Sequence, residues 1–224
     1  MDTKTYNVNL KAKKTSWGGL ALNLSKNGKL LGGVNKPMDS EMALVLTDEQ
    51  GENQLRYFYS DWRTMESVPD EFILSPNKKS CISTFTLPKV KNINVSLLDT
   101  SNIENMTQMF MNCQELRELD LSSFNVNKVV SFQAMFSRCY KIKRINLAGW
   151  DTSNGTVFTD MFRECGELEE IKGVIDINKA GSALSNMFYG CNKLKQIKIK
   201  ATQAQQKNFL DYAQVSPNTE VIFV

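Results

Sequence analysis

The sequence of 224 residues contains no histidine. This absence excludes serine and cysteine nucleophiles that an imidazole activates, and it excludes zinc sites and acid–base steps built on histidine. Enzymes that work with carboxylate pairs or lysine stay open, but the range of catalytic chemistry is narrow. We therefore expect a protein that is not an enzyme, with no catalytic residue, no metal ligand and no cofactor site.

The sequence also lacks a strong charge of one sign, because 27 Lys and Arg residues face 24 Asp and Glu residues. A nucleic-acid partner usually requires a concentrated basic face, so none is expected. The longest apolar runs, such as 42–46 and 221–224, are too short to cross a membrane, and we expect no membrane insertion. The N-terminal segment has no apolar stretch of the kind found in secretion signals. Either the chain is a mature form with an added Met, or it is not exported by that route.

The strongest feature that is present is an internal repeat of 26 residues. The motif Met-Phe-x-x-Cys-x-x-(Leu/Ile) begins at Met109, Met135, Met161 and Met187. Apolar residues before and after the motif recur at the same spacing: Met106, Phe132, Phe158 and Leu184, and then Leu119, Ile145, Ile171 and Ile197. A repeat of this length indicates a solenoid, in which stacked units share one continuous core.

Each unit combines two kinds of apolar pattern. The apolar residues within 106–113 recur at i, i+3, i+4 and i+7, which predicts a short helix or helical turn. Leu119 then alternates with the polar residues Glu118 and Asp120, which predicts a short strand. The segment 122–128 is rich in Ser and Asn and predicts a return turn.

The motif Met-Phe-x-x-Cys-x-x-Leu-x-x-Leu-x-Leu, together with Asp-Thr-Ser-Asn at 99–102 and 151–154, resembles the BspA-type bacterial surface leucine-rich repeat. The resemblance covers residues 88–201, and it implies a surface-exposed bacterial protein with a role in adhesion or host-protein binding. Two features depart from that pattern. Gly173 and Val174 interrupt the strand column of one unit, and neither a signal peptide nor a lipid-attachment motif is visible.

Four cysteines, Cys113, Cys139, Cys165 and Cys191, occupy one column of the repeat, and Cys81 stands outside it. Stacked units would place neighbouring cysteines near the strand spacing of about 4.8 Å, which a disulfide tolerates. Side chains in one column point in parallel directions, however, and this disfavours a bridge. We therefore favour a ladder of buried free thiols over disulfides, a metal site or a nucleophile.

Residues 1–87 do not share the repeat and are predicted to form a separate β-rich domain. Asn27-Gly28 between two apolar runs favours a type I′ hairpin, and the segment around Gly51 favours a second hairpin. Two further strands are predicted before residue 88, so the expected architecture is an antiparallel β-sandwich or barrel-like domain. The fold class expected for the whole chain is α+β. A leucine-rich-repeat solenoid of about four to five units over 88–224, with a C-terminal helix–strand cap, follows the β domain.

A candidate binding face follows from the exposed strand positions of the solenoid. Its two columns consist of Glu118, Arg144, Glu170 and Gln196, and of Asp120, Asn146, Lys172 and Lys198. The first column alternates in charge, which is also what a simple solvated ladder of paired charges would show. The second column changes from acidic to basic and leaves a modest positive end at Lys172 and Lys198, with Lys195 and Lys200 nearby.

Two functions are consistent with these features. The first is a non-enzymatic adhesion protein, located at the cell surface or outside the cell, that binds a protein or glycan partner through the strand face. The alternative is a structural or receptor-binding component of a bacteriophage virion or a similar particle, because a start Met without an export signal fits release by lysis. A symmetric homo-oligomer would fit this alternative.

Overall fold

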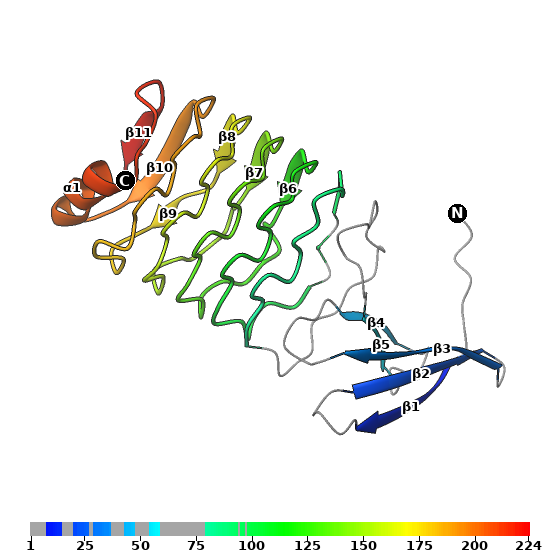
Figure 1. The fold of residues 1–224 in the computed structure, drawn as a ribbon. Coiled ribbons are helices and arrows are strands. Elements are labelled where there is room, and N and C mark those ends of the chain that lie inside the picture. The colour runs from blue at the N-terminus through cyan, green and yellow to red at the C-terminus, as the bar shows by residue number, and fades with distance from the viewer. Residues whose placement is uncertain are drawn as a thin grey trace. The chain divides into compact units, whose positions relative to one another are not determined.

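The computed structural model describes residues 8–14, 20–26, 29–36, 43–47, 54–58 and 79–224, except 94 and 97. The chain divides into two compact units, one of Met1–Asp61 with Glu71–Ile73 and one of Trp62–Asp70 with Leu74–Val224. Figure 1 shows the described strands and the helix of both units.

The described strands of the first unit form two separate antiparallel sheets. One contains β1 (Val8–Lys14), β2 (Leu20–Lys26) and β3 (Lys29–Lys36), and the other contains β4 (Ala43–Thr47) and β5 (Gln54–Phe58). The Asn27-Gly28 hairpin is confirmed in its strand pairing, because Lys26 lies opposite Lys29.

The predicted antiparallel β-sandwich or barrel is wrong. Hairpin turns determine which neighbouring strands pair, but they do not determine whether separate hairpins pack into a sandwich or close into a barrel. The strand predicted over residues 71–76 lies outside the described residues. Residues 81–88 were expected to form the last strand of this domain. They instead form tight turns within the first described repeat of the solenoid, and Ser80 forms a β-bridge with Asn105 of the next repeat.

The second unit is a β-solenoid, which confirms the predicted solenoid and corrects the predicted α+β class. Each 26-residue turn of the chain, called a coil below, contributes a short parallel strand. β6 (Glu118–Asp120), β7 (Arg144–Asn146) and β8 (Glu170–Lys172) form one sheet. β9 (Ile175–Asp176), β10 (Gln196–Lys200) and β11 (Glu220–Phe223) form the next sheet, in the order β11-β10-β9. The described chain is mostly β, with the single short helix α1 (Gln203–Tyr212).

The helical turn predicted over 106–113 is wrong, because this segment forms consecutive turns. Alternate N–H groups donate to the next coil: Gln108 donates to the carbonyl of Gln133 (2.8 Å), and Phe110 donates to that of Met135 (2.9 Å). An α-helix would use these N–H groups internally and could not pair sideways. The turns therefore extend the ladder between coils, while the same apolar spacing still faces the core.

Left-handed backbone conformations make these turns possible. They recur at two positions in each coil, namely Gln108 and Asn112, Ala134 and Arg138, Asp160 and Glu164, and Asn186 and Gly190. A left-handed conformation costs a residue with a side chain about 1–2 kcal/mol. Packing and hydrogen bonds between coils offset this cost.

The core consists of ladders of equivalent side chains. Successive rings of Phe85, Phe110, Phe136, Phe162 and Phe188 stack with centroids 5.1–5.9 Å apart. All five rings are buried. Stacked aromatic pairs contribute about 0.5–1.5 kcal/mol each beyond their buried area, so the ladder favours adding one coil to the next.

The C-terminal end closes the stack with α1 and β11. The side chain of Thr202 caps the start of α1 by accepting a hydrogen bond from the N–H of Gln205. Phe209 of α1 is buried, and its ring meets those of Phe188 and Phe223 edge-on, each with centroids 6.0 Å apart. The helix and strand that the sequence predicted at this end are both present, and they cover the last coil.

Candidate functional site

The strands β6, β7, β8 and β10 present one polar face and bury the other side of each strand. Leu119, Ile145, Ile171 and Ile197 are buried, as the alternating pattern predicted. The structure places all eight candidate residues on the polar side of these strands: Glu118, Asp120, Arg144, Asn146, Glu170, Lys172, Gln196 and Lys198. We call these eight residues the strand face.

The first column of the strand face is paired along the stack. Glu118 lies opposite Arg144, and Arg144 lies opposite Glu170. The guanidinium of Arg144 donates to the carboxylate of Glu118. Gln196 donates to Glu220 of β11 at 2.7 Å. These side chains are exposed, so each pair contributes at most about 1 kcal/mol to stability.

The second column changes character along the stack. The carboxylate of Asp120 accepts hydrogen bonds from the N–H and hydroxyl of Ser122 and from the amide of Asn146 (3.0, 2.7 and 3.0 Å). The bonds from Ser122 hold the pKa of Asp120 below its ordinary value. Lys172 and Lys198 form no ion pair within the described part of the chain. Of the positive end predicted from the sequence, Lys172, Lys195 and Lys198 therefore have no acidic partner in an ion pair among the described residues, whereas Lys200 pairs with Asp176 at 3.1 Å.

Further charge pairs join equivalent positions of neighbouring coils outside the strand face. Lys141 pairs with Glu115 (2.6 Å), and Lys193 pairs with Glu167 (2.7 Å). These bonds hold the pKa values of both glutamates below the ordinary value. Sequence reasoning missed the pairs, although opposite charges 26 residues apart were the signal that could have found them.

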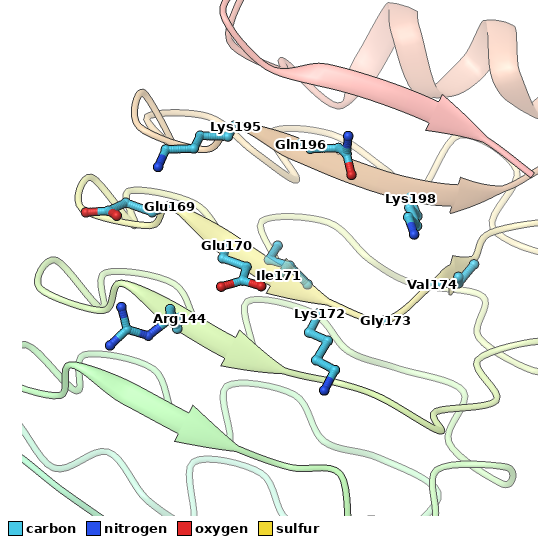
Figure 2. Close-up of a pocket in the computed structure, with 10 residues that line it drawn as sticks. All are labelled: Arg144, Glu169, Glu170, Ile171, Lys172, Gly173, Val174, Lys195, Gln196 and Lys198. Carbon is cyan, nitrogen blue, oxygen red and sulfur yellow. The ribbon is translucent and has the colours of Figure 1, made fainter.

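Two hollows lie along the strand face. The larger has a volume of about 600 Å³ and is drawn in Figure 2. Its lining comes from β7, β8 and β10 and from residues next to the ends of β8 and β10: Arg144, Glu169, Glu170, Ile171, Lys172, Gly173, Val174, Lys195, Gln196 and Lys198. The second hollow, of about 390 Å³, lies over β6, β7 and β8 and includes Asn92 and Ile93. Together the two hollows are lined by all eight residues of the strand face.

The predicted thiol ladder is present, and none of the five cysteines forms a disulfide. The thiols of Cys113, Cys139, Cys165 and Cys191 each donate to the carbonyl of a phenylalanine in the preceding coil, at 2.8–3.1 Å. Burial raises the pKa values of Cys139 and Cys165 well above the ordinary value. Because the thiolate is the reactive form of cysteine, the environment of these groups favours packing over chemistry.

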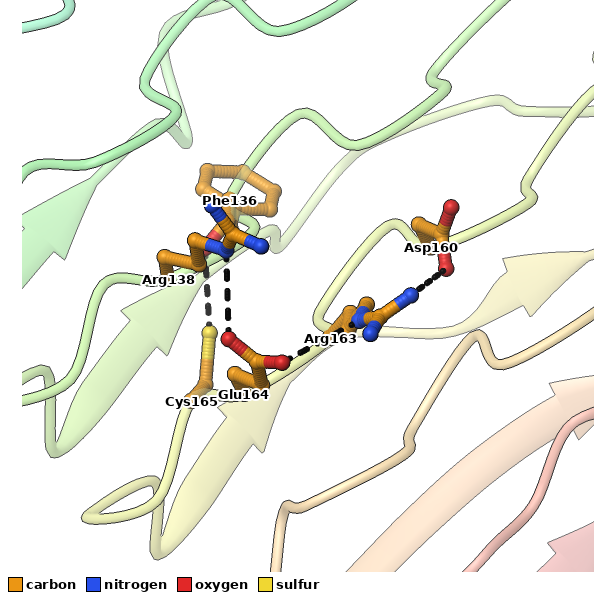
Figure 3. Close-up of polar contacts among 6 residues, drawn as sticks. All are labelled: Phe136, Arg138, Asp160, Arg163, Glu164 and Cys165. Atoms are coloured by element: carbon orange, nitrogen blue, oxygen red, sulfur yellow. Dashed lines mark hydrogen bonds and ion pairs between the residues drawn. The ribbon is translucent and has the colours of Figure 1, made fainter.

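A second polar cluster lies beside this ladder. Figure 3 shows Glu164 between Arg138 (3.2 Å) and Arg163 (3.3 Å), while Arg163 also reaches Asp160 at 3.6 Å. Arg163 additionally lies over the ring of Tyr189, 5.4 Å from its centroid. The two arginines of this cluster pair with two carboxylates, so it offers an incoming ligand less uncompensated charge than the lysines of the strand face do.

The described residues contain no group of three or more His, Cys, Asp or Glu side chains placed to hold a metal ion. None of their helices is both long and apolar enough to span a membrane.

Residues 79–201 match the family model described as "Mycoplasma protein of unknown function, DUF285". The match begins at the first described residue of the second unit and ends one residue after β10. No curated protein and no solved structure matches the chain significantly.

Proposed function

We propose that this chain, which belongs to the DUF285 family, is a non-enzymatic binding protein that presents the strand face of its solenoid to a protein or glycan partner. The observation that carries the proposal is the strand face itself. Eight polar side chains from four coils share one surface with two adjoining hollows. Solenoids commonly bind partners on such extended surfaces, because stacking the coils repeats each exposed position along the face.

The chemistry of the described side chains supports binding more than catalysis. The sequence offers no imidazole as a general base, and the thiols of the repeat donate to carbonyls inside the core. Glu118 and Asp120 on the strand face accept hydrogen bonds from Arg144 and Asn146, which join neighbouring coils. A binding role needs only their arrangement and no proton transfer.

We further propose a location at the bacterial cell surface, where the partner would be met. This part rests on the resemblance of the repeat to BspA-type surface leucine-rich repeats. Mass spectrometry of washed envelopes, culture medium, cytosol and phage-sized particles from one culture tests it. Recovery in the envelope or medium is expected. Recovery in particles at structural stoichiometry would contradict the surface location and would favour a virion component.

Site-specific photo-crosslinking tests the strand face as the binding surface. A photoreactive phenylalanine analogue replaces Asn146 on the strand face, and a matched variant carries it at the exposed Gln133 on the turn segment. Each purified variant is added to intact cells and then illuminated. The cells are taken from the source culture and from the cell types among which the source organism grows. We expect covalent adducts from position 146 and few from position 133. Equal adducts, or adducts from position 133 alone, would contradict the proposal.

A further inference from the structure

The ladder of strands is interrupted between β8 and β10. β8 is the last strand of the sheet with β6 and β7, whereas β10 pairs with β9 and β11. Lys172 and Lys198 lie 26 residues apart, as the repeat requires, but Ile175 pairs with Ile199, only 24 residues later. Two residues therefore lie between Lys172 and Ile175 that have no counterparts between Lys198 and Ile199, and they are surplus to the register. They are Gly173 and Val174, and we call them the bulge.

The bulge leaves backbone groups without partners. Neither the N–H nor the carbonyl of Gly173 or Val174 takes part in a hydrogen bond with any described residue. Both residues are only partly exposed, and both line the larger hollow. Elsewhere in the stack the corresponding step is bonded, since Leu147 donates to the carbonyl of Lys172 at 2.7 Å. The bulge thus offers backbone hydrogen-bond donors and acceptors that, in the regular coils, are bonded to a neighbouring coil.

Only glycine fits the first position of the bulge. Gly173 has φ of +122°, and a Cβ there would lie 2.7 Å from the carbonyl oxygen of Leu147. This conformation is one that residues with side chains rarely adopt. The sequence therefore specifies the interruption of the ladder at this position.

Lysines without acidic partners surround the bulge. Lys172, Lys195 and Lys198 are exposed and line the same hollow, and none forms an ion pair among the described residues. The hollow also contains Arg144, Glu169 and Glu170, so its four cations outnumber its two carboxylates. Figure 2 shows Lys172 just before the bulge, Lys198 on the neighbouring strand β10, and Lys195 just before that strand. A ligand that carries negative charge complements this arrangement.

We infer that the bulge and its three lysines form a subsite for an acidic peptide segment of a protein partner, and this inference rests on the proposed binding function. An extended peptide can exchange main-chain hydrogen bonds with Gly173 and Val174, while its carboxylates meet Lys172, Lys195 and Lys198. Sugars usually stack on exposed aromatic rings, and no aromatic residue lines this hollow. The chemistry of the subsite therefore favours a peptide over a glycan.

The test measures binding of a fluorescein-labelled peptide of alternating Glu and Gly to the full chain by fluorescence anisotropy, with alternating Gln and Gly as the control peptide. We expect saturable binding of the acidic peptide, weakened by added salt, and much weaker binding of the control. Two double variants carry the same change in net charge. K172E/K198E should lose about tenfold or more in affinity, whereas K89E/K207E, which alters exposed lysines away from the hollow, should bind like the parent.

A deletion of Gly173 and Val174 tests the contribution of the bulge to binding separately from the contribution of the lysines. It leaves every lysine in place and shortens the spacing between Lys172 and Lys198 to the 24 residues at which Ile175 pairs with Ile199. Thermal unfolding verifies that the deleted chain folds, and the charge variants test the same subsite without altering the backbone. We expect the deletion to weaken the acidic peptide about tenfold. Unchanged affinity would mean that charge alone binds the peptide and would overturn the role of the bulge.

Other outcomes also decide the inference. Equal loss in both double variants would show unspecific attraction and would overturn the subsite. Tighter binding of a sulfated oligosaccharide than of the acidic peptide, abolished by K172E/K198E, would overturn the choice of a peptide. If the acidic peptide does not bind but crosslinking from position 146 persists, the inference fails and the proposed function stands. If crosslinking at position 146 also fails, the proposed function fails with it.

Discussion

The regular stack of β6, β7 and β8 and the interrupted junction between β8 and β10 use the same repeat in different ways. In the regular stack, Glu118 pairs with Arg144 and Asp120 accepts a hydrogen bond from Asn146. At the junction, two surplus residues leave backbone groups and lysines without such partners. The difference indicates that regularity supplies stability, whereas an interruption supplies unsatisfied groups that a ligand can satisfy.

The largest expected effect breaks the regular stack. Phe136 is buried between the rings of Phe110 and Phe162, so Phe136→Ala removes a large side chain and both stacking contacts. The free energy of unfolding, measured with urea, should fall by about 4 kcal/mol. Tyr140 is exposed in the same coil, and Tyr140→Ala should change it by less than about 0.5 kcal/mol. A loss below about 1 kcal/mol for Phe136→Ala would show that the phenylalanine ladder contributes little.

The next effect concerns the bulge. Gly173→Ala forces a Cβ against the carbonyl oxygen of Leu147 in an unfavourable conformation, and should lower the free energy of unfolding by about 2–3 kcal/mol. Gly149 also has positive φ (+84°), but a Cβ there meets nothing within 4 Å. Gly149→Ala should therefore cost only about 1 kcal/mol. Equal losses in the two variants would remove the steric reason for glycine at 173.

A smaller effect is expected in the thiol ladder. Cys139 is fully buried and donates to the carbonyl of Phe110 at 3.1 Å, so Cys139→Ala should lower the free energy of unfolding by about 1–2 kcal/mol. In the parent chain, burial and the raised pKa of Cys139 should prevent reaction with a thiol reagent at pH 8 until the solenoid unfolds. Rapid labelling of Cys139 in the native chain would contradict a packed ladder.

The smallest effect comes from the charge pairs of the surface. The pKa values of Glu115 and Glu167 are lowered by their bonds to Lys141 and Lys193, from an ordinary value of 4.5. At acidic pH the unfolded chain therefore binds more protons than the folded chain. The stabilisation from these two pairs should be fully present above about pH 5 and should decline as the pH falls below it. Glu115→Gln with Glu167→Gln should flatten this decline in Tm between pH 6 and pH 3. An unaltered decline would assign the acid sensitivity to other carboxylates.

The sequence was sufficient to predict the solenoid because the columns that begin at Met109 and Leu119 repeat the same residue types at a constant interval. It was also sufficient to predict the strand face, since alternation around Leu119 exposes Glu118 and Asp120. These features depend on local order along the chain. Stacking then converts them into long columns.

The features that were missed depend on backbone conformation and long-range pairing. Apolar spacing over 106–113 suits a helical turn and two successive turns equally well, and only the left-handed residues Gln108 and Asn112 distinguish them. The hairpins of the first unit predicted their own pairing but not a packed architecture. Gly173 was visible as an irregularity, yet the hollow beside it depends on the slipped register between β9 and β10.

Amide-resolved NMR of the full chain during titration with the acidic peptide tests the central claim most directly. In the free chain, the amide protons of Gly173 and Val174 should exchange quickly with solvent, because no described residue accepts a hydrogen bond from them. Addition of the peptide should slow that exchange and should produce the largest shifts at Gly173, Val174 and Lys198, with small shifts at Arg144 and Asn146. Shifts confined to β6 and β7, or spread evenly over all strands, would contradict the claim that the interruption is the binding subsite.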